Sequence, residues 1–233
     1  YQELAEALSE WKVSVGDAEE ALLAMKNPYD TIALQAAGIG YRADYAYHNG
    51  KYYVYFGIVP VLLLYLPYYL LTGGALQNYV AVFVFFAGFI IAAAGFVYEL
   101  MKRYFKEQPF YLWAVGTGML VGSYSMFYLL IRPDLYHVPI VASAMFATGG
   151  LWLYLAGLNR PKKAVGLYAF GSFCMALTAG CRPQFILFAA LAVVLFWERV
   201  FVKRELFSKK GWRQTAALVV PYVLIAAGLM AYN

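Results

Sequence analysis

Long runs of apolar residues dominate the chain after residue 53. Six of these runs are close to the roughly 20 residues that a helix needs to cross the hydrocarbon core of a bilayer. The pattern predicts an all-α, polytopic membrane protein whose transmembrane bundle extends over 79–233. The six predicted spans are 79–101, 110–131, 138–158, 164–180, 185–202 and 215–232.

The first 52 residues are more polar and predict a surface segment. Apolar residues recur at helical spacing over 1–15, which indicates an amphipathic helix that lies on a surface and does not cross it. A short helix is expected over 18–25, because Asp17 and Glu20 form a typical helix start and Pro28 ends the pattern.

The dipeptide Asn49-Gly50 predicts a short β-hairpin in this segment, since both residues tolerate the positive φ of a type I′ turn. The expected strand partners are His48 with Lys51, Ala46 with Tyr53 and Asp44 with Tyr55. Because side chains alternate between the faces of a strand, one face becomes a candidate binding surface, made of Asp44, His48, Lys51, Tyr53 and Tyr55. The simpler alternative is an interfacial hairpin, whose tyrosines gather at headgroup level for their amphipathic rings alone.

The apolar run at 53–73 differs from the others because it contains Pro60 and Pro67. Proline in the middle of a helix removes a backbone hydrogen bond that lipid cannot replace. We therefore expect an interfacial or re-entrant helix here in preference to a span.

Composition supports the membrane assignment, and charge orients it. The chain is 63% hydrophobic and 13% charged, with a net charge of +5. Acidic residues gather before residue 51, and basic residues gather in three clusters at the ends of apolar runs, near 102–106, 160–163 and 199–213. The positive-inside rule places these clusters in the cytoplasm and makes 1–52 the first external loop. The clusters need no partner beyond anionic headgroups, so nucleic acid is a poor explanation.

Cysteine and histidine predict neither a disulfide nor a metal site. Cys174 and Cys181 fall on one helix, about 10 Å apart along its axis, which is too far for a bond between them. The two histidines, His48 and His137, do not complete a ligand set with them.

Two arginines stand outside the basic clusters, on the external side of the predicted topology. Arg132 begins the loop RPDLYHVP, which also contains Asp134 and His137, and Arg182 lies in CRPQ. A charge that departs from the topology rule at the membrane is a functional hypothesis by default. The alternative is structural: Arg182 reaches the outer headgroups, and Asp134 caps a helix or pairs with Arg132.

These residue types suit a substrate with a phosphate head and an apolar tail. The planar fork of arginine binds phosphate and keeps its charge, and tyrosine offers a flat ring and a hydroxyl to a sugar. A carboxylate placed as general base for an acceptor hydroxyl is the missing part.

The order of motifs NPYD, DYAYHNGKYYVYFGIVP, PYYLLTG, RPDLYHVP and GCRPQ resembles bacterial membrane proteins of the GT-C glycosyltransferase superfamily. The resemblance is to the protein O-mannosyltransferase and aminoarabinose transferase types of glycosyltransferase family 39, and it covers 1–202. It implies a multi-pass enzyme of the bacterial cell membrane. Such an enzyme transfers a sugar, with inversion, from a polyprenyl-phosphate donor to an acceptor on the external face.

The resemblance also implies roles for single residues. Asp134 matches an acidic residue that holds the donor phosphate or a divalent cation, and Arg182 matches a basic residue that contacts the lipid phosphate. The family's catalytic Asp is expected before Tyr1, so we expect a fragment that is inactive by itself. A Lys-Pro pair of some relatives is Val59-Pro60 here, which leaves Lys51 or Arg182 as a substitute for that lysine.

Two other classes of protein compete with this hypothesis. In a secondary transporter, Arg132, Asp134 and Arg182 would line a solute path, although the chain lacks the repeated halves typical of that class. In a non-catalytic scaffold, the external loop would bind a partner protein.

Overall fold

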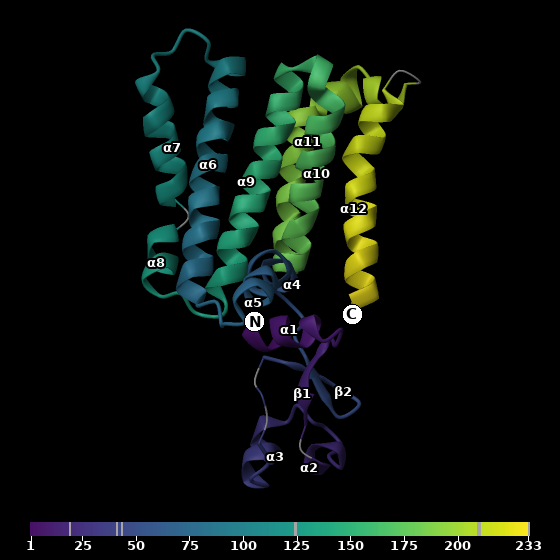
Figure 1. Cartoon of the computed structure of the whole chain (residues 1–233). Coiled ribbons are helices and arrows are strands. Elements are labelled where there is room, and N and C mark those ends of the chain that lie inside the picture. Colours follow the sequence, from purple (N-terminus) through teal and green to yellow (C-terminus); the bar gives the residue numbers. More distant parts are fainter. Residues whose placement is uncertain (19, 41, 43, 124, 209–210, 233) are drawn as a thin grey trace. The chain divides into compact units, whose positions relative to one another are not determined.

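The computed structural model describes residues 1–18, 20–40, 42, 44–123, 125–208 and 211–232 (Figure 1). The chain divides into two compact units, Tyr1–Leu76 and Gln77–Asn233.

The first unit combines short helices with a small sheet. Its elements are α1 (Gln2–Ser9), β1 (Ser14–Asp17), α2 (Glu20–Leu23), α3 (Thr31–Ala36), β2 (Ala46–His48), β3 (Lys51–Tyr53), α4 (Ile58–Pro60), the π-helical η1 (Val61–Tyr65) and α5 (Leu66–Thr72).

Helix α1 is shorter than the pattern predicted, so the expectation of one helix over 1–15 is wrong. Trp11 adopts a left-handed conformation with φ of 60°. The N–H of Lys12 donates to the carbonyl of Ala7 and the N–H of Trp11 to that of Leu8. This pair of bonds is the Schellman arrangement that ends helices. It satisfies the last carbonyls of α1 and turns the chain into β1.

The sheet has three strands in the order β1-β3-β2, all antiparallel. Across β2 and β3, His48 lies opposite Lys51 and Ala46 opposite Tyr53. The expected pairing of Asp44 with Tyr55 is wrong, because Asp44 has φ of 66° and both residues lie outside the strands.

Strand β1 covers the other edge of β3 and was not predicted. Asp17 lies opposite Lys51, with an irregularity between Ser14 and Asp17. Gly16 supplies the unusual backbone there, with φ of 144°, as glycine often does at a bulge.

The predicted helix at 53–73 begins later, at Ile58, because Tyr53 belongs to β3. Gly57 precedes it in a left-handed conformation, with φ of 79°. A π-helical segment lies just ahead of Pro67. The wider π turn accommodates a residue whose ring and missing N–H do not fit a regular α-helical turn. The apolar helix Ile58–Thr72 is shorter than the candidate spans of the second unit.

The second unit is helical throughout its regular elements. They are α6 (Asn78–Tyr104), α7 (Tyr111–Ser123), α8 (Met126–Ile131), α9 (His137–Asn159), η2 (Pro161–Lys163), α10 (Ala164–Cys181), η3 (Pro183–Ala189), α11 (Ala190–Trp197), η4 (Glu198–Val202), η5 (Glu205–Phe207) and α12 (Trp212–Tyr232).

Five helical stretches in the described part of the chain are long and apolar enough to cross a bilayer. They are Asn78–Tyr104, His137–Asn159, Pro161–Cys181, Pro183–Val202 and Trp212–Tyr232. The mainly helical architecture of a membrane protein is therefore confirmed. The predicted span at 110–131 consists of two shorter helices, α7 and α8, and its residue 124 lies outside the described residues. A sixth span stays a prediction.

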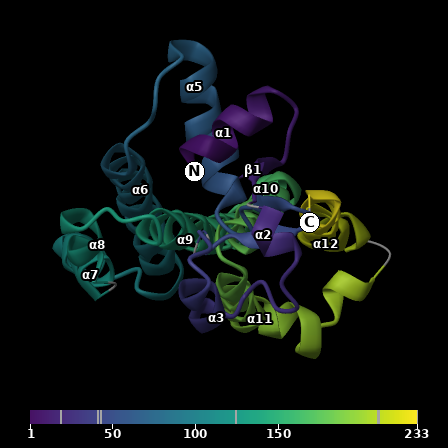
Figure 2. The same cartoon turned by 90° about the horizontal axis from the view of Figure 1, so that it is seen from below.

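Helix α9 lies at the centre of the second unit, with α6 packed on one side and α10 on the other, and α12 packs on α10 (Figure 2). Helices α9 and α10 approach closely at two glycines. A Cβ added to Gly150 would lie 2.9 Å from the carbonyl oxygen of Gly171. Small residues at a crossing are the usual way in which membrane helices achieve close packing.

Candidate functional site

The loop between α8 and α9 forms one half of the candidate site. Pro133 follows Arg132, which ends α8 in a non-helical conformation. The carbonyl of Arg132 accepts the N–H of Asp134 at 2.8 Å and contacts Nδ1 of His137, and the carbonyl of Asp134 accepts the N–H of His137 at 3.0 Å. These contacts tighten the loop before α9 begins at His137.

Arg182 at the end of α10 forms the other half. Its N–H bonds to the carbonyl of Thr178, and Pro183 then prevents α10 from continuing. The guanidinium carbon of Arg182 lies 5.7 Å from the ring centroid of Tyr136, within the range of a cation–π contact. The structure thus brings RPDLYHVP and CRPQ together, and Tyr136 makes the contact.

The two structural alternatives for Asp134, a helix cap and an ion pair with Arg132, find no support in the described part of the chain. There, neither Arg132, Asp134 nor Arg182 takes part in an ion pair. The N-cap residue of α9 is Tyr136, and no side chain caps that end. Arg132 and Asp134 are exposed, and Arg182 is half-buried. Two guanidinium groups and a carboxylate are thus available to a ligand.

The remaining predicted residues belong to the first unit, where they separate. Lys51 lines a cleft of about 460 Å³ whose other charged residues are Glu3, Glu6, Glu10, Lys12, Asp17 and Arg42. Four carboxylates around Lys51 oppose the binding of a phosphate there. Two residues of its lining, Arg42 and Glu3, form a 2.5 Å ion pair.

Asp44 lines a different, smaller pocket of about 230 Å³ with Arg42 and several tyrosines. Its ring walls come from Tyr29, Tyr45, Tyr47 and Tyr52. The hydroxyl of Tyr29 both donates to the carbonyl and accepts from the N–H of Tyr47, which fixes its ring. Partial burial, and secondly the nearby Glu3 carboxylate, raise the pKa of Tyr45.

The other hairpin residues contribute little to either pocket. Tyr53 is half-buried between its strand partners, and His48 is exposed. Tyr55 is 52% exposed, with its ring 4.9 Å from that of Phe56. The strand register keeps His48, Lys51 and Tyr53 on one face. Asp44 and Tyr55 lie outside the strands, and Asp44 and Lys51 line different pockets.

Sequence reasoning missed the roles of Arg42 and Tyr136 as organising residues. Arg42 lines both pockets of the first unit, and its position beside three tyrosines in YRADYAY was the available signal. Within the described residues, no group of three or more His, Cys, Asp and Glu residues could hold a metal ion.

Comparisons with protein-family models, with curated proteins and with solved structures found no significant match to this chain.

Proposed function

We propose that the chain is part of a membrane glycosyltransferase that uses a polyprenyl-phosphate sugar as donor and acts on the external face of a bacterial cell membrane. The observation that carries this proposal is the contact of Arg182 with Tyr136, which joins two charged motifs at one end of the helical bundle. An arginine held on an aromatic ring beside apolar helices suits a phosphate head on a lipid tail.

Arg182 would bind the donor phosphate. The cation–π contact with Tyr136 would hold the guanidinium in place, and its N–H groups would donate to the phosphate oxygens. Arg132 would add a second positive charge. Asp134 would orient the donor head, either by accepting hydrogen bonds from sugar hydroxyls or by sharing a divalent cation with the phosphate.

The reaction would be an inverting displacement at the anomeric carbon. The acceptor hydroxyl oxygen forms a bond to that carbon while the bond to the phosphate oxygen breaks. The polyprenyl phosphate leaves with the electron pair, and a carboxylate general base takes the acceptor proton. Arg182 would stabilise the charge that develops on the leaving phosphate.

The transporter alternative is less well supported. Transport sites use ionisable groups inside the membrane that change partners. The buried carboxylate among the described helical residues, Glu99, is paired with Arg160 near the end of α6. A buried ion pair of this kind is typical of a contact that holds two helices together.

The experiment is a transfer assay in membranes that contain the intact protein. Radiolabelled polyprenyl phosphates carrying mannose, glucose or aminoarabinose are supplied, and labelled acceptor is measured. We expect transfer from one of these donors and at least a tenfold loss in Arg182→Ala. Arg213→Ala is the matched control, because Arg213 also lies on an aromatic ring, that of Trp212, with a separation of 5.8 Å. Equal transfer by the two variants would remove the assignment of Arg182.

A further inference from the structure

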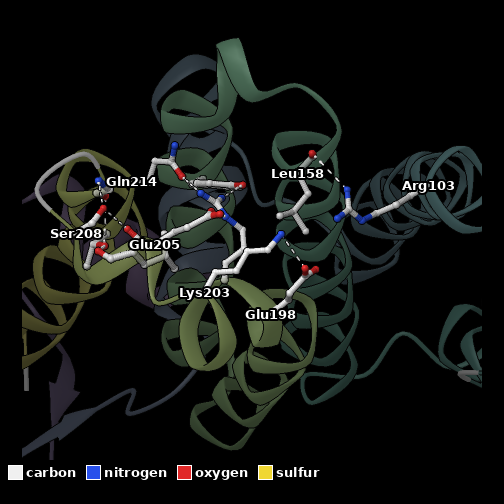
Figure 3. A network of polar contacts seen from close by, with 12 residues as sticks. Arg103, Leu158, Glu198, Lys203, Glu205, Ser208 and Gln214 are labelled. Carbon is white, nitrogen blue, oxygen red and sulfur yellow. Dashed lines mark hydrogen bonds and ion pairs between the residues drawn. The ribbon is translucent and has the colours of Figure 1, made fainter.

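A polar cavity lies between helices of the second unit, among residues of the basic clusters. Its volume is about 290 Å³. It is lined from α6, α9, α10, η4 and α12, and from the segment between the last two. The charged residues of its lining are Arg103, Glu198, Arg199, Lys203 and Glu205 (Figure 3).

Two of the three cations of this cavity have carboxylate partners. Arg199 donates from Nε to Glu205 at 2.9 Å, and its other nitrogens donate to Tyr168 at 3.0 Å and to Gln214 at 2.7 Å. Lys203 lies 2.8 Å from Glu198. Both carboxylates of the lining are therefore already engaged (Figure 3).

Arg103 is the cation that lacks such a partner among the described residues. One of its terminal nitrogens, Nη1, makes two long contacts, at 3.4 Å to the carbonyl of Leu158 and at 3.3 Å to the side-chain oxygen of Asn159. Its Nε is buried and has no hydrogen-bond partner in the described structure. A buried donor without an acceptor is costly, and an anion in the cavity would offset this cost by pairing with the terminal nitrogens of the same guanidinium.

We propose that this cavity binds the phosphate of an anionic phospholipid, with Arg103 as the principal contact. The phosphate would accept hydrogen bonds from the terminal nitrogens of the Arg103 guanidinium, and the nearby Arg199 and Lys203 would add positive potential. Basic pockets between membrane helices at the cytoplasmic side are typical sites for anionic headgroups. The site is separate from the proposed donor site at Arg182.

The surroundings favour a lipid over a free phosphate. The helical segments next to the cavity expose large apolar side chains, among them Trp197, Phe201 and Trp212, which are 56%, 52% and 60% exposed. Aromatic residues of this kind collect where acyl chains meet headgroups. A lipid can therefore place its phosphate in the cavity and its chains along these helices, whereas a free phosphate gains the polar contacts alone.

The test measures lipid retention by the full chain from nanodiscs that contain equal amounts of phosphatidylglycerol and phosphatidylcholine, with native mass spectrometry as the readout. We expect wild-type protein to retain phosphatidylglycerol preferentially. In Arg103→Gln, the ratio of retained phosphatidylglycerol to phosphatidylcholine should fall at least tenfold, because the charge-assisted hydrogen bonds to the phosphate are lost. Lys106→Gln is the matched control and should lose no more than about fivefold, the factor for a generic basic residue near an anionic surface.

Two further measurements keep the outcome clear. Arg103→Lys retains the charge and should keep more of the preference than Arg103→Gln, and circular dichroism checks that each variant is folded. An equal loss in Arg103→Gln and Lys106→Gln would contradict the site. Displacement of the retained lipid by glycerol 3-phosphate or inorganic phosphate would show a soluble anion as the ligand and overturn the proposal.

Discussion

Arg182 stacks on Tyr136, with the guanidinium carbon 5.7 Å from the ring centroid. The two residues end and begin different helical segments, since Arg182 caps α10 and Tyr136 is the N-cap of α9. The contact therefore fixes the direction of a charged group at one end of the bundle. In the proposed enzyme, this direction determines where the donor phosphate binds.

The ring of Tyr136, not its hydroxyl, should matter for phosphate binding. Tyr136→Leu removes the cation–π contact, which contributes roughly 0.5–2 kcal/mol, so affinity for undecaprenyl phosphate should fall about twofold to thirtyfold. Tyr136→Phe keeps the ring and should bind like the wild type. Microscale thermophoresis in detergent measures both affinities. If Tyr136→Phe loses as much affinity as Tyr136→Leu, the ring is not the relevant group.

The pair of Glu99 and Arg160 should hold the ends of α6 and α9 together. Glu99 is 2% exposed, accepts from Arg160 at 2.5 Å and accepts from Asn159 at 2.8 Å. Arg160→Gln leaves a buried carboxylate with one donor fewer. We expect a loss of about 2–3 kcal/mol in unfolding free energy, below the roughly 3–5 kcal/mol of a fully buried pair, because Asn159 still donates. Thermal unfolding in detergent measures this, with the exposed Lys162→Gln as control. Equal melting temperatures for the two variants would contradict the role of the pair.

The crossing of α9 and α10 should depend on Gly171. A Cβ there would lie 2.9 Å from the ring of Tyr154 and 3.1 Å from the carbonyl oxygen of Gly150. Gly171→Ala should therefore lower the unfolding free energy by about 1–3 kcal/mol. Gly166 on the same helix has nothing within 4 Å, and Gly166→Ala should be neutral or stabilise by up to about 1 kcal/mol through helix propensity. Thermal unfolding of both variants, without added denaturant, tests this prediction. A lower stability of Gly166→Ala than of Gly171→Ala would refute it.

In the first unit, Gly57 should be sensitive for two separable reasons. Its φ of 79° strains any L-residue, and a Cβ would lie 2.6 Å from the ring of Tyr1. Gly38 has a similar φ of 65° with nothing within 4 Å. Gly38→Ala should cost about 1–2 kcal/mol for the backbone alone, and Gly57→Ala should cost about 1–3 kcal/mol more because of the contact. The rate of cleavage within the first unit, measured by limited proteolysis of the full chain, provides the readout. Equal cleavage rates in the two variants would show that the contact with Tyr1 does not contribute.

Hydropathy was sufficient to predict most of the helical bundle. The predicted segment 138–158 appears as α9 over His137–Asn159, and 164–180 as α10 over Ala164–Cys181. The reason is that a bilayer requires an apolar segment of nearly fixed length. The segment 110–131 satisfies the same composition but is divided by a left-handed Ser125, which a hydropathy window does not detect.

The first unit was harder to predict because its turns decide the fold. The amphipathic spacing continues past Ser9, but the left-handed Trp11 ends α1. Strand β1 contains Gly16 and Asp17, which are poor strand formers, and it exists because β3 offers it an edge. Local preference is weak here, and the tertiary contact prevails.

For the candidate site, the charge pattern predicts that Arg132, Asp134 and Arg182 share the external side of the membrane, but it does not predict which residues touch. The contact of Arg182 with Tyr136 depends on how α9 and α10 pack, which no local pattern specifies. The carboxylates around Lys51 were not predicted either, since they come from α1 and β1, which are distant from Lys51 along the chain.

The most direct test of the proposed function is the binding of undecaprenyl phosphate and of uncharged undecaprenol to wild-type protein, Arg182→Ala and Arg213→Ala. Two charge-assisted hydrogen bonds separate the phosphate from the alcohol. We expect the wild type and Arg213→Ala to bind the phosphate more tightly than the alcohol. In Arg182→Ala, the ratio of the two affinities should fall at least tenfold, while the affinity for undecaprenol stays the same. Equal preference for the phosphate in all three proteins would contradict the proposed function.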